Sequence, residues 1–264
     1  MNVAVIGKGL IGGSLEKAAL RAKHNAEVFR GRGPVPDLKK FDFVFIAVPP
    51  SAVEGIVRAI AAAGTLRDGA VVMDISGVKG SVCRALSDFA GAKTWTFIGA
   101  HPMAGKEKLG YANSCENLFD GASMILTPFE SADRLVVKAT SEFLKTLGFF
   151  KVVVTDTDDH DGMIAYTSQL CHLVSSAYVR EELSARHSGY SAGSFRDMVR
   201  VGAPDPDTWT ELFFENKSHL LPVLDRYIKR LVRFREALAS DDRATLHADL
   251  EEGVEAKRKI DEEK

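Results

Sequence analysis

The stretch NVAVIGKGLIGGS, at residues 2–14, decides the fold. The strand-forming run Asn2–Ile6 leads into a GxGxxG spacing, and a helical pattern follows over 10–23. Such glycines allow a tight turn and a close approach of the backbone to a pyrophosphate, and the free N–H groups of the helix start favour an anion. The stretch therefore predicts a Rossmann-type dinucleotide-binding domain, with a cofactor site at Gly7, Gly9, Leu10, Ile11 and Gly12.

Short apolar runs alternate with helical patterns through the first 155 residues. Near-continuous apolar strands separated by helices are typical of a mostly parallel sheet that is covered on both faces. The link between the second and third strands is too short for the usual helix. The expected strands are 2–6, 26–30, 41–48, 70–75, 94–98, 123–127 and 149–155, and the expected helices are 10–23, 51–63, 79–89 and 132–147.

The predicted secondary structure changes after Thr155, where strand-forming runs stop and helical patterns continue. A long helical pattern covers 158–186, a Gly/Ser-rich break covers 188–194, and Pro204 and Pro206 indicate a second break after a short helix near 195–201. Apolar stripes follow over 217–238 and on a last helix. We expect an α/β fold: an N-terminal Rossmann-type, mostly parallel sheet at 1–155, and a C-terminal all-helical domain at 156–264. We expect the helical domain to bind substrate, and its many apolar helix faces predict that it forms a homodimer.

Composition excludes several classes of function. The 264 residues carry a net charge of −2, so nothing indicates nucleic acid or anionic lipid as a partner. No apolar run approaches the roughly 18 residues of a membrane helix, and no signal peptide is evident. Three widely spaced cysteines, Cys83, Cys115 and Cys171, favour neither a disulfide framework nor a zinc site. We expect a cytoplasmic protein without a metal.

The segment after the second expected strand concerns cofactor choice. A carboxylate there usually accepts the ribose 2′-OH of NAD, but this chain has Arg30-Gly31-Arg32. Arg30 or Arg32 could meet the 2′-phosphate of NADP, or both could be solvated loop residues. Val48, at the end of the third expected strand, completes the predicted cofactor site. The sequence thus predicts NAD or NADP, with a slight preference for NADP.

Polar motifs follow the fourth and fifth expected strands, where an open parallel sheet binds its ligand. They are DISGVK at 74–79 and HPMAGKEK at 101–108. Ser76 and His101 are therefore expected near a nicotinamide ring. A third motif runs from Asp159-His160-Asp161 to Ser168 and His172, which lie four residues apart and should share a helix face.

Together these motifs resemble the prephenate dehydrogenase family. The resemblance runs in order through GKGLIGGS, DISGVK, GAHPMAGKEKLG, the HD…SQLCH helix, and FRDMVR followed by DPDTW and ENK, over most of residues 1–235. It implies oxidative decarboxylation of the small molecule prephenate to 4-hydroxyphenylpyruvate on the route to tyrosine, or of arogenate in close relatives. Gln169 stands where the family often has histidine, and Cys171 where it often has proline, which leaves the substrate open.

The resemblance also implies roles for single residues. His101 would accept the proton of the ring hydroxyl, and Ser76 would orient that histidine. Arg200 would bind a substrate carboxylate. The remaining residues predicted at the substrate pocket are Ser168, His172, Glu107, which matches a gating position, and His160, which could instead be only a polar residue at a helix start.

Two other classes of protein remain open from the sequence. A β-hydroxyacid dehydrogenase shares the plan of a Rossmann domain and helices but places a catalytic lysine on the long helix, and no lysine occurs between Thr155 and Arg186. A nucleotide-sensing module without catalysis would not need His101, Ser76 and Arg200 together.

Overall fold

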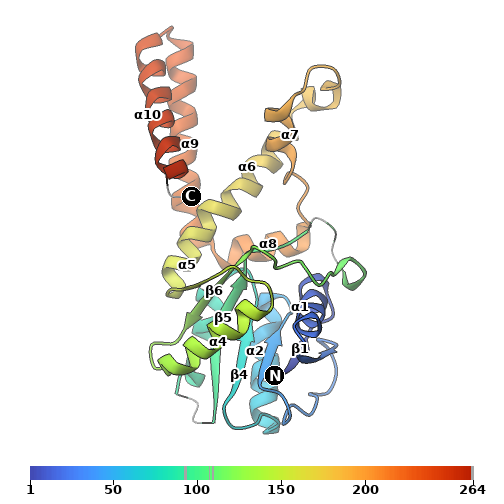
Figure 1. Cartoon of the computed structure of the whole chain (residues 1–264). Helices are drawn as coiled ribbons and strands as arrows, with labels where there is room; N and C mark the ends of the chain where they lie inside the picture. The colour runs from blue at the N-terminus through green and yellow to red at the C-terminus, as the bar shows by residue number, and fades with distance from the viewer. Residues whose placement is uncertain (92–93, 107, 109, 263–264) are drawn as a thin grey trace. The chain divides into compact units, whose positions relative to one another are not determined.

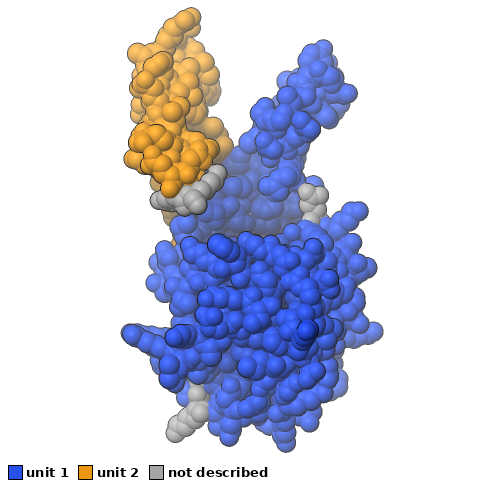
Figure 2. All heavy atoms as spheres, viewed as in Figure 1, with its two compact units in different colours: residues 1–217 blue, residues 218–264 orange. Residues whose placement is uncertain are grey.

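The computed structural model describes residues 1–91, 94–106, 108 and 110–262. These residues form two compact units, Met1–Lys217 and Ser218–Lys264 (Figure 2). The first unit holds the sheet, its covering helices and a further group of helices, and the second holds a helical hairpin.

The core of the first unit is a seven-stranded sheet with the order β2-β1-β3-β4-β5-β6-β7 (Figure 1). The strands β1 to β5 are parallel, β6 is antiparallel to β5, and β7 is parallel to β6. The mostly parallel sheet predicted from the sequence is thereby confirmed. The strands are β1 Asn2–Ile6, β2 Asn25–Phe29, β3 Phe43–Ile46, β4 Ala70–Asp74, β5 Trp95–Pro102, β6 Ser123–Pro128 and β7 Lys151–Val154.

Strand β5 runs four residues beyond its expected end at Ile98. Residues 98–102 pair with 124–128 of β6, so the ladder continues through His101, which faces Ile125 across it. His101 therefore lies within a strand, not in the loop after it. This pairing depends on β6, a strand from a later part of the chain, which local sequence does not indicate.

Helices cover both faces of the sheet and bury two apolar clusters. Aromatic rings help to fill one of them: Phe43 stacks on Phe143 of α4 with ring centroids 3.8 Å apart. No helix forms between β2 and β3, as expected, and the buried side chains of Leu38 and Phe41 pack there instead. The covering helices are α1 Leu10–Arg21, α2 Pro50–Ala63, α3 Gly80–Ala85, the short 3-10 turn η1 Ser87–Phe89, and α4 Arg134–Thr146.

The helices after Thr155 differ from the sequence prediction in two places. The long helix ends at Tyr178 rather than Arg186, and it changes from α5 (Thr157–Ile164) to a π-helical segment (η3, Ala165–Leu170) and then to α6 (Cys171–Tyr178). The first unit ends with the 3-10 turn η4 Glu182–Arg186, α7 Gly193–Val199 and α8 Pro206–Glu215; one further 3-10 turn, η2 Tyr111–Asn113, precedes β6. The expected break lies between α7 and α8 and contains Pro204, but Pro206 is already the first residue of α8.

The start of α8 explains why Pro206 belongs to a helix and not to the break before it. Proline is well tolerated in the first turn of a helix, because the N–H group it lacks would have no partner there. The Asp205 carboxylate accepts a hydrogen bond from the Thr208 backbone N–H at 2.9 Å and so caps the helix. The dipeptide Asp205-Pro206 therefore marks a helix start.

The second unit consists of α9, which spans Lys217–Ala239, and α10, which spans Arg243–Glu262. Arg233 of α9 pairs with Asp249 of α10 at 2.6 Å. Within the described residues, no helix is both long and apolar enough to cross a membrane. Several large apolar side chains of this unit remain exposed: Leu221, Ile228, Leu231, Val232, Leu238, Leu250, Val254 and Ile260.

Candidate active site

The glycine loop between β1 and α1 has the geometry of a pyrophosphate cradle. Gly7 has a φ of +121°, and a Cβ there would lie 2.0 Å from the Ala47 carbonyl oxygen. A Cβ on Gly12 would lie 2.0 Å from the Gly7 carbonyl oxygen, whereas Gly9 borders open space. No side chain caps α1 at Gly9, so the first-turn N–H groups, which include those of Leu10 and Ile11, face that space. The loop therefore fits a dinucleotide phosphate.

The turn that carries Arg30 and Arg32 packs against this cradle. A Cβ on Gly31 would lie 2.7 Å from Val48 Cγ1 and 3.7 Å from Gly7 Cα. Both arginines are exposed, and neither has an ion-pair partner in the described part of the chain. The structure thus brings Val48 and the turn with the two arginines together beside the glycine loop. The adenosine ribose of a dinucleotide held by that loop would lie next to them.

A buried ion pair lies below the end of β4. Lys79 donates to the Asp74 carboxylate, and both side chains are fully buried. The hydroxyl of Ser76 donates to the same carboxylate oxygen at 2.5 Å and lies 3.3 Å from Lys79 Nζ. Asp74 thus fixes the orientation of the serine that sequence analysis placed at the reaction centre. Sequence analysis missed both Asp74 and Lys79, although they flank that serine in the same motif.

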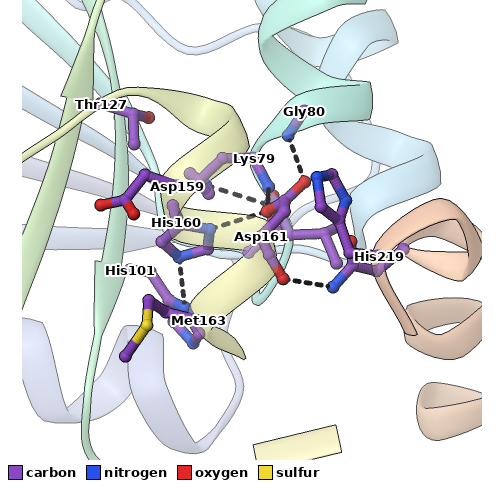
Figure 3. Close-up of polar contacts among 12 residues, drawn as sticks. Lys79, Gly80, His101, Thr127, Asp159, His160, Asp161, Met163 and His219 are labelled. Atoms are coloured by element: carbon purple, nitrogen blue, oxygen red, sulfur yellow. Dashed lines mark hydrogen bonds and ion pairs between the residues drawn. The ribbon is translucent and has the colours of Figure 1, made fainter. Parts of the chain in front are cut away.

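His101 forms a hydrogen-bonded chain with two residues of α5 (Figure 3). Its Nδ1 lies 3.0 Å from Nε2 of His160, and Nδ1 of His160 lies 2.7 Å from Oδ1 of Asp161. Burial lowers the pKa of His101 well below the usual histidine value, and the nearby His160 and Lys79 lower it further. His101 is consequently a neutral imidazole near pH 7, as a general base must be.

Asp161 is an ionised carboxylate at the end of this chain. Burial raises its pKa, but hydrogen bonds from His160 and from the backbone N–H groups of Lys79 and Gly80 lower it more, so that the net pKa lies below the ordinary value. The two backbone bonds are each 2.8 Å long. Sequence analysis quoted Asp161 within the HD motif but gave it no role, because its backbone partners are about 80 residues away.

A pocket of about 680 Å³ within the first unit gathers cationic side chains. His172 of α6 and Arg200, which follows α7, line it together with two lysines of the loop after β5, Lys106 and Lys108. Sequence analysis quoted the motif with both lysines but assigned them no role. The pocket also contains Trp209, whose ring centroid lies 3.6 Å from that of His172.

The environment of His172 keeps its imidazole neutral. Burial lowers its pKa, a hydrogen bond to the Val201 carbonyl oxygen at 3.1 Å raises it, and the charge of Arg200 lowers it, with a net decrease. A neutral His172 donates from Nδ1 to that carbonyl, which leaves Nε2 as an acceptor.

The residues predicted from the sequence thus fall into two groups. Ser76, His101 and His160 meet at the ends of β4 and β5, while His172 and Arg200 share the cationic pocket. Ser168 is half-buried in the π-helical segment and is not among the residues that line this pocket. Both ring nitrogens of His160 are engaged by protein groups. Glu107 lies outside the described residues, and within those residues no cluster of three His, Cys, Asp or Glu side chains could hold a metal ion.

A dinucleotide cradle and a neutral histidine at the carboxyl end of a parallel sheet define a nicotinamide-dependent oxidoreductase. Comparison with known families makes this assignment specific. Residues 5–154 match the nucleotide-binding domain of prephenate dehydrogenase, and residues 156–252 match its dimerization domain. The chain belongs to the prephenate dehydrogenase family.

Similarity to individual proteins supports membership of this family. The cyclohexadienyl dehydrogenase of Zymomonas mobilis is 31% identical, over 91% of this chain and 89% of that protein. A crystal structure of prephenate dehydrogenase from A. aeolicus, in complex with hydroxyphenyl propionate and NAD+, superposes with a TM-score of 0.81 at 25% identity, over 98% of both chains. Synechocystis arogenate dehydrogenase gives a TM-score of 0.78 at 25% identity, over 98% of this chain and 100% of that one.

Proposed function

We propose that this protein catalyses the NAD(P)-dependent oxidative decarboxylation of prephenate to 4-hydroxyphenylpyruvate. The observation that carries the proposal is the neutral His101 at the end of the sheet. A Cβ built on Gly77 would lie 3.7 Å from His101 Nε2, so this nitrogen faces the strand end that bears Ser76. A ring hydroxyl bound there could give its proton to Nε2.

The proposed chemistry needs no metal. His101 takes the hydroxyl proton as the carbon that bears it loses hydride, which a bound nicotinamide accepts. Carbon dioxide leaves as the ring becomes aromatic, and the aromatic product makes that loss favourable. Ser76 donates its hydroxyl proton to Asp74 and accepts from Lys79 Nζ at 3.3 Å, which leaves one oxygen lone pair for the reacting hydroxyl.

Prephenate fits the cationic pocket better than arogenate. Prephenate carries two carboxylates, whereas arogenate replaces the keto group of the side chain with an ammonium. Lys106, Lys108 and Arg200 supply three positive charges, and Asp205, the one carboxylate among the described residues that line the pocket, also caps α8. Arogenate is the second candidate because the structure of an arogenate dehydrogenase matches 98% of this chain.

A spectrophotometric assay tests this proposal directly. Each combination of prephenate or arogenate with NAD or NADP is followed by the absorbance of the reduced nicotinamide. We expect turnover with prephenate and a lower kcat/KM with arogenate. Reduction with neither acid would contradict the proposal, and a preference for arogenate would reverse the choice of substrate.

Arg200→Ala is expected to weaken substrate binding by roughly 10- to 150-fold. A charge-assisted hydrogen bond contributes about 1.5–3 kcal/mol, and that contact exists in both the ground state and the transition state. The loss should therefore raise KM more than it lowers kcat. Steady-state kinetics measure it, with Arg196→Ala on the neighbouring helix α7 as the matched control. An unchanged KM would remove Arg200 from the substrate site.

We also propose that Arg30 and Arg32 read the adenosine ribose, with a slight preference for NADP. No carboxylate stands there to repel a 2′-phosphate, and an arginine in reach would add about 1.5–3 kcal/mol of binding. Arg30→Ala or Arg32→Ala should lower kcat/KM for NADP and leave that for NAD nearly unchanged. A strong preference for NAD in the wild type, unmoved by either substitution, would show that the arginines do not read the ribose.

The proposal extends to the domains of the chain and to its oligomeric state. We propose a division near Thr155 into a cofactor domain and a helical domain, and a homodimer formed mainly by the latter. The match to a dimerization domain and the exposed apolar residues of α9 and α10 support the dimer. Light scattering at micromolar concentration should give the mass of two chains, and the mass of one chain would contradict the dimer.

We also propose that the protein is cytoplasmic. The three free thiols favour this compartment, because the cytoplasm keeps thiols reduced.

A further inference from the structure

Three side chains from two elements form a hydrogen-bonded chain that ends at His101. Asp161 Oδ1, both nitrogens of His160 and Nδ1 of His101 are joined by contacts of 2.7 Å and 3.0 Å (Figure 3). His160 and Asp161 belong to α5, whereas His101 belongs to β5. His160 contacts His101 directly, whereas Asp161 reaches it through His160 and also accepts hydrogen bonds from the backbone after Ser76.

The direction of each hydrogen bond follows from the carboxylate. An ionised carboxylate only accepts, so His160 Nδ1 carries a proton and donates it to Asp161. A neutral His160 then has a bare Nε2, which must accept from Nδ1 of His101. A neutral imidazole has one N–H, and with that proton on Nδ1 the lone pair of His101 lies on Nε2.

We propose that Asp161 and His160 are positioning residues that hold His101 in its Nδ1–H tautomer, with Nε2 as the base. Nε2 is the nitrogen beside Gly77, at the strand end that carries Ser76. The opposite tautomer would place a proton on Nε2, where it could not accept another. The proposal rests on the proposed function for the proton that Nε2 takes, but the tautomer itself does not depend on the substrate.

A buried polar network holds Asp161 rigidly. Its carboxylate accepts from the backbone N–H groups of Lys79 and Gly80, which ties α5 to the segment after β4. Its carbonyl oxygen accepts from Asn216 Nδ2 at 2.9 Å, and the same amide donates to Gln169 Oε1 at 2.8 Å. Gln169, one of the departures from the family pattern, thus belongs to the support of this chain. A fully hydrogen-bonded network of this kind fixes side-chain orientation.

His101 lies among charged and titratable groups from two parts of the fold. His160 and Asp161 face it from α5, and the buried Lys79–Asp74 pair with Ser76 faces it from β4 and the segment after it. The hydrogen bond to His160 reaches Nδ1 of His101 directly, so His160 decides which nitrogen of His101 carries the proton.

Nitrogen NMR of histidine-labelled protein tests the tautomer without any substrate. At about pH 8, above the ordinary histidine pKa of about 6.5, His101 should show a protonated Nδ1 and an unprotonated Nε2. The His101→Asn spectrum assigns the resonances. In His160→Leu the population should move toward the Nε2–H form. A wild-type His101 with its proton on Nε2 would overturn the proposal.

Kinetics of two substitutions separate positioning from packing. His160→Leu fills the space without an acceptor and should lower kcat about 10²- to 10⁴-fold, with a smaller change in KM. In His160→Gln the amide oxygen can replace Nε2 as the acceptor, so we expect kcat within about tenfold of the wild type. Cofactor affinity and thermal unfolding show whether each variant folds.

The outcomes distinguish this inference from the proposed function. Near-normal turnover in His160→Leu, or a glutamine variant as slow as the leucine variant, would overturn the positioning role. A wild-type protein with no turnover on either acid would contradict the proposed function instead, and the NMR result would still decide the tautomer.

Discussion

Replacing His101 with asparagine is expected to reduce kcat about 10²- to 10⁴-fold while the cofactor still binds. The substitution removes the nitrogen that accepts the hydroxyl proton but keeps an amide of similar size in β5. The glycine loop is built from β1 and α1, whose packing involves Gly7, Gly12 and Ala47 and no atom of His101. Turnover is measured with prephenate, and cofactor affinity by fluorescence titration of the reduced nicotinamide.

The pH dependence gives this prediction a second readout. Because burial, His160 and Lys79 lower the pKa of His101, the wild type should keep its kcat/KM below pH 6.5. Activity should then fall as the pH falls through the lowered pKa and His101 takes up a proton. The residual activity of His101→Asn should lack this acid limb. His247→Asn, on the exposed surface of α10, is the control, and a His101→Asn variant with normal turnover would make His101 structural.

Most of the sheet and the cofactor cradle could be predicted because their signals are local. The glycine spacing, the strand before it and the helix after it lie within residues 2–23, and the structure has β1 and α1 there. Apolar runs likewise marked all seven strands of the described sheet. The resemblance added the family, which the domain matches confirm.

The parts that sequence analysis missed depend on contacts between distant residues. The extension of β5 needs β6, and the Asp161 carboxylate needs N–H groups from the segment after β4. The cationic pocket combines Lys106 and Lys108 with Arg200, about 90 residues later. The π-helical segment breaks the four-residue spacing on which the pairing of Ser168 with His172 rested. Helical periodicity cannot reveal an irregular turn of this kind.

Replacing Lys79 with methionine is expected to destabilise the fold by about 3–5 kcal/mol. Lys79 and Asp74 are both fully buried, and one Asp74 oxygen accepts from Lys79 Nζ, the Ser76 hydroxyl and the Ser76 backbone N–H. Methionine removes the compensating charge and leaves the carboxylate buried. The second oxygen, Oδ1, has no hydrogen-bond partner among the described residues. No hydrogen bond to that oxygen would therefore stabilise the buried charge once Lys79 is gone. Urea unfolding with linear extrapolation measures the change.

A second substitution separates the charge from the packing around it. In Lys79→Met with Asp74→Asn both charges are gone, and the double variant should recover most of the lost stability, because neutral partners of similar volume replace a buried ion pair at little cost. Arg58→Met, which breaks an exposed pair with Asp88, should have a small effect. If Lys79→Met unfolds at the same urea concentration as the wild type, the ion pair does not stabilise the fold. Since the charge of Lys79 also lowers the pKa of His101, the single variant should move the acid limb of kcat/KM to higher pH, which links the buried pair to the base that it underlies.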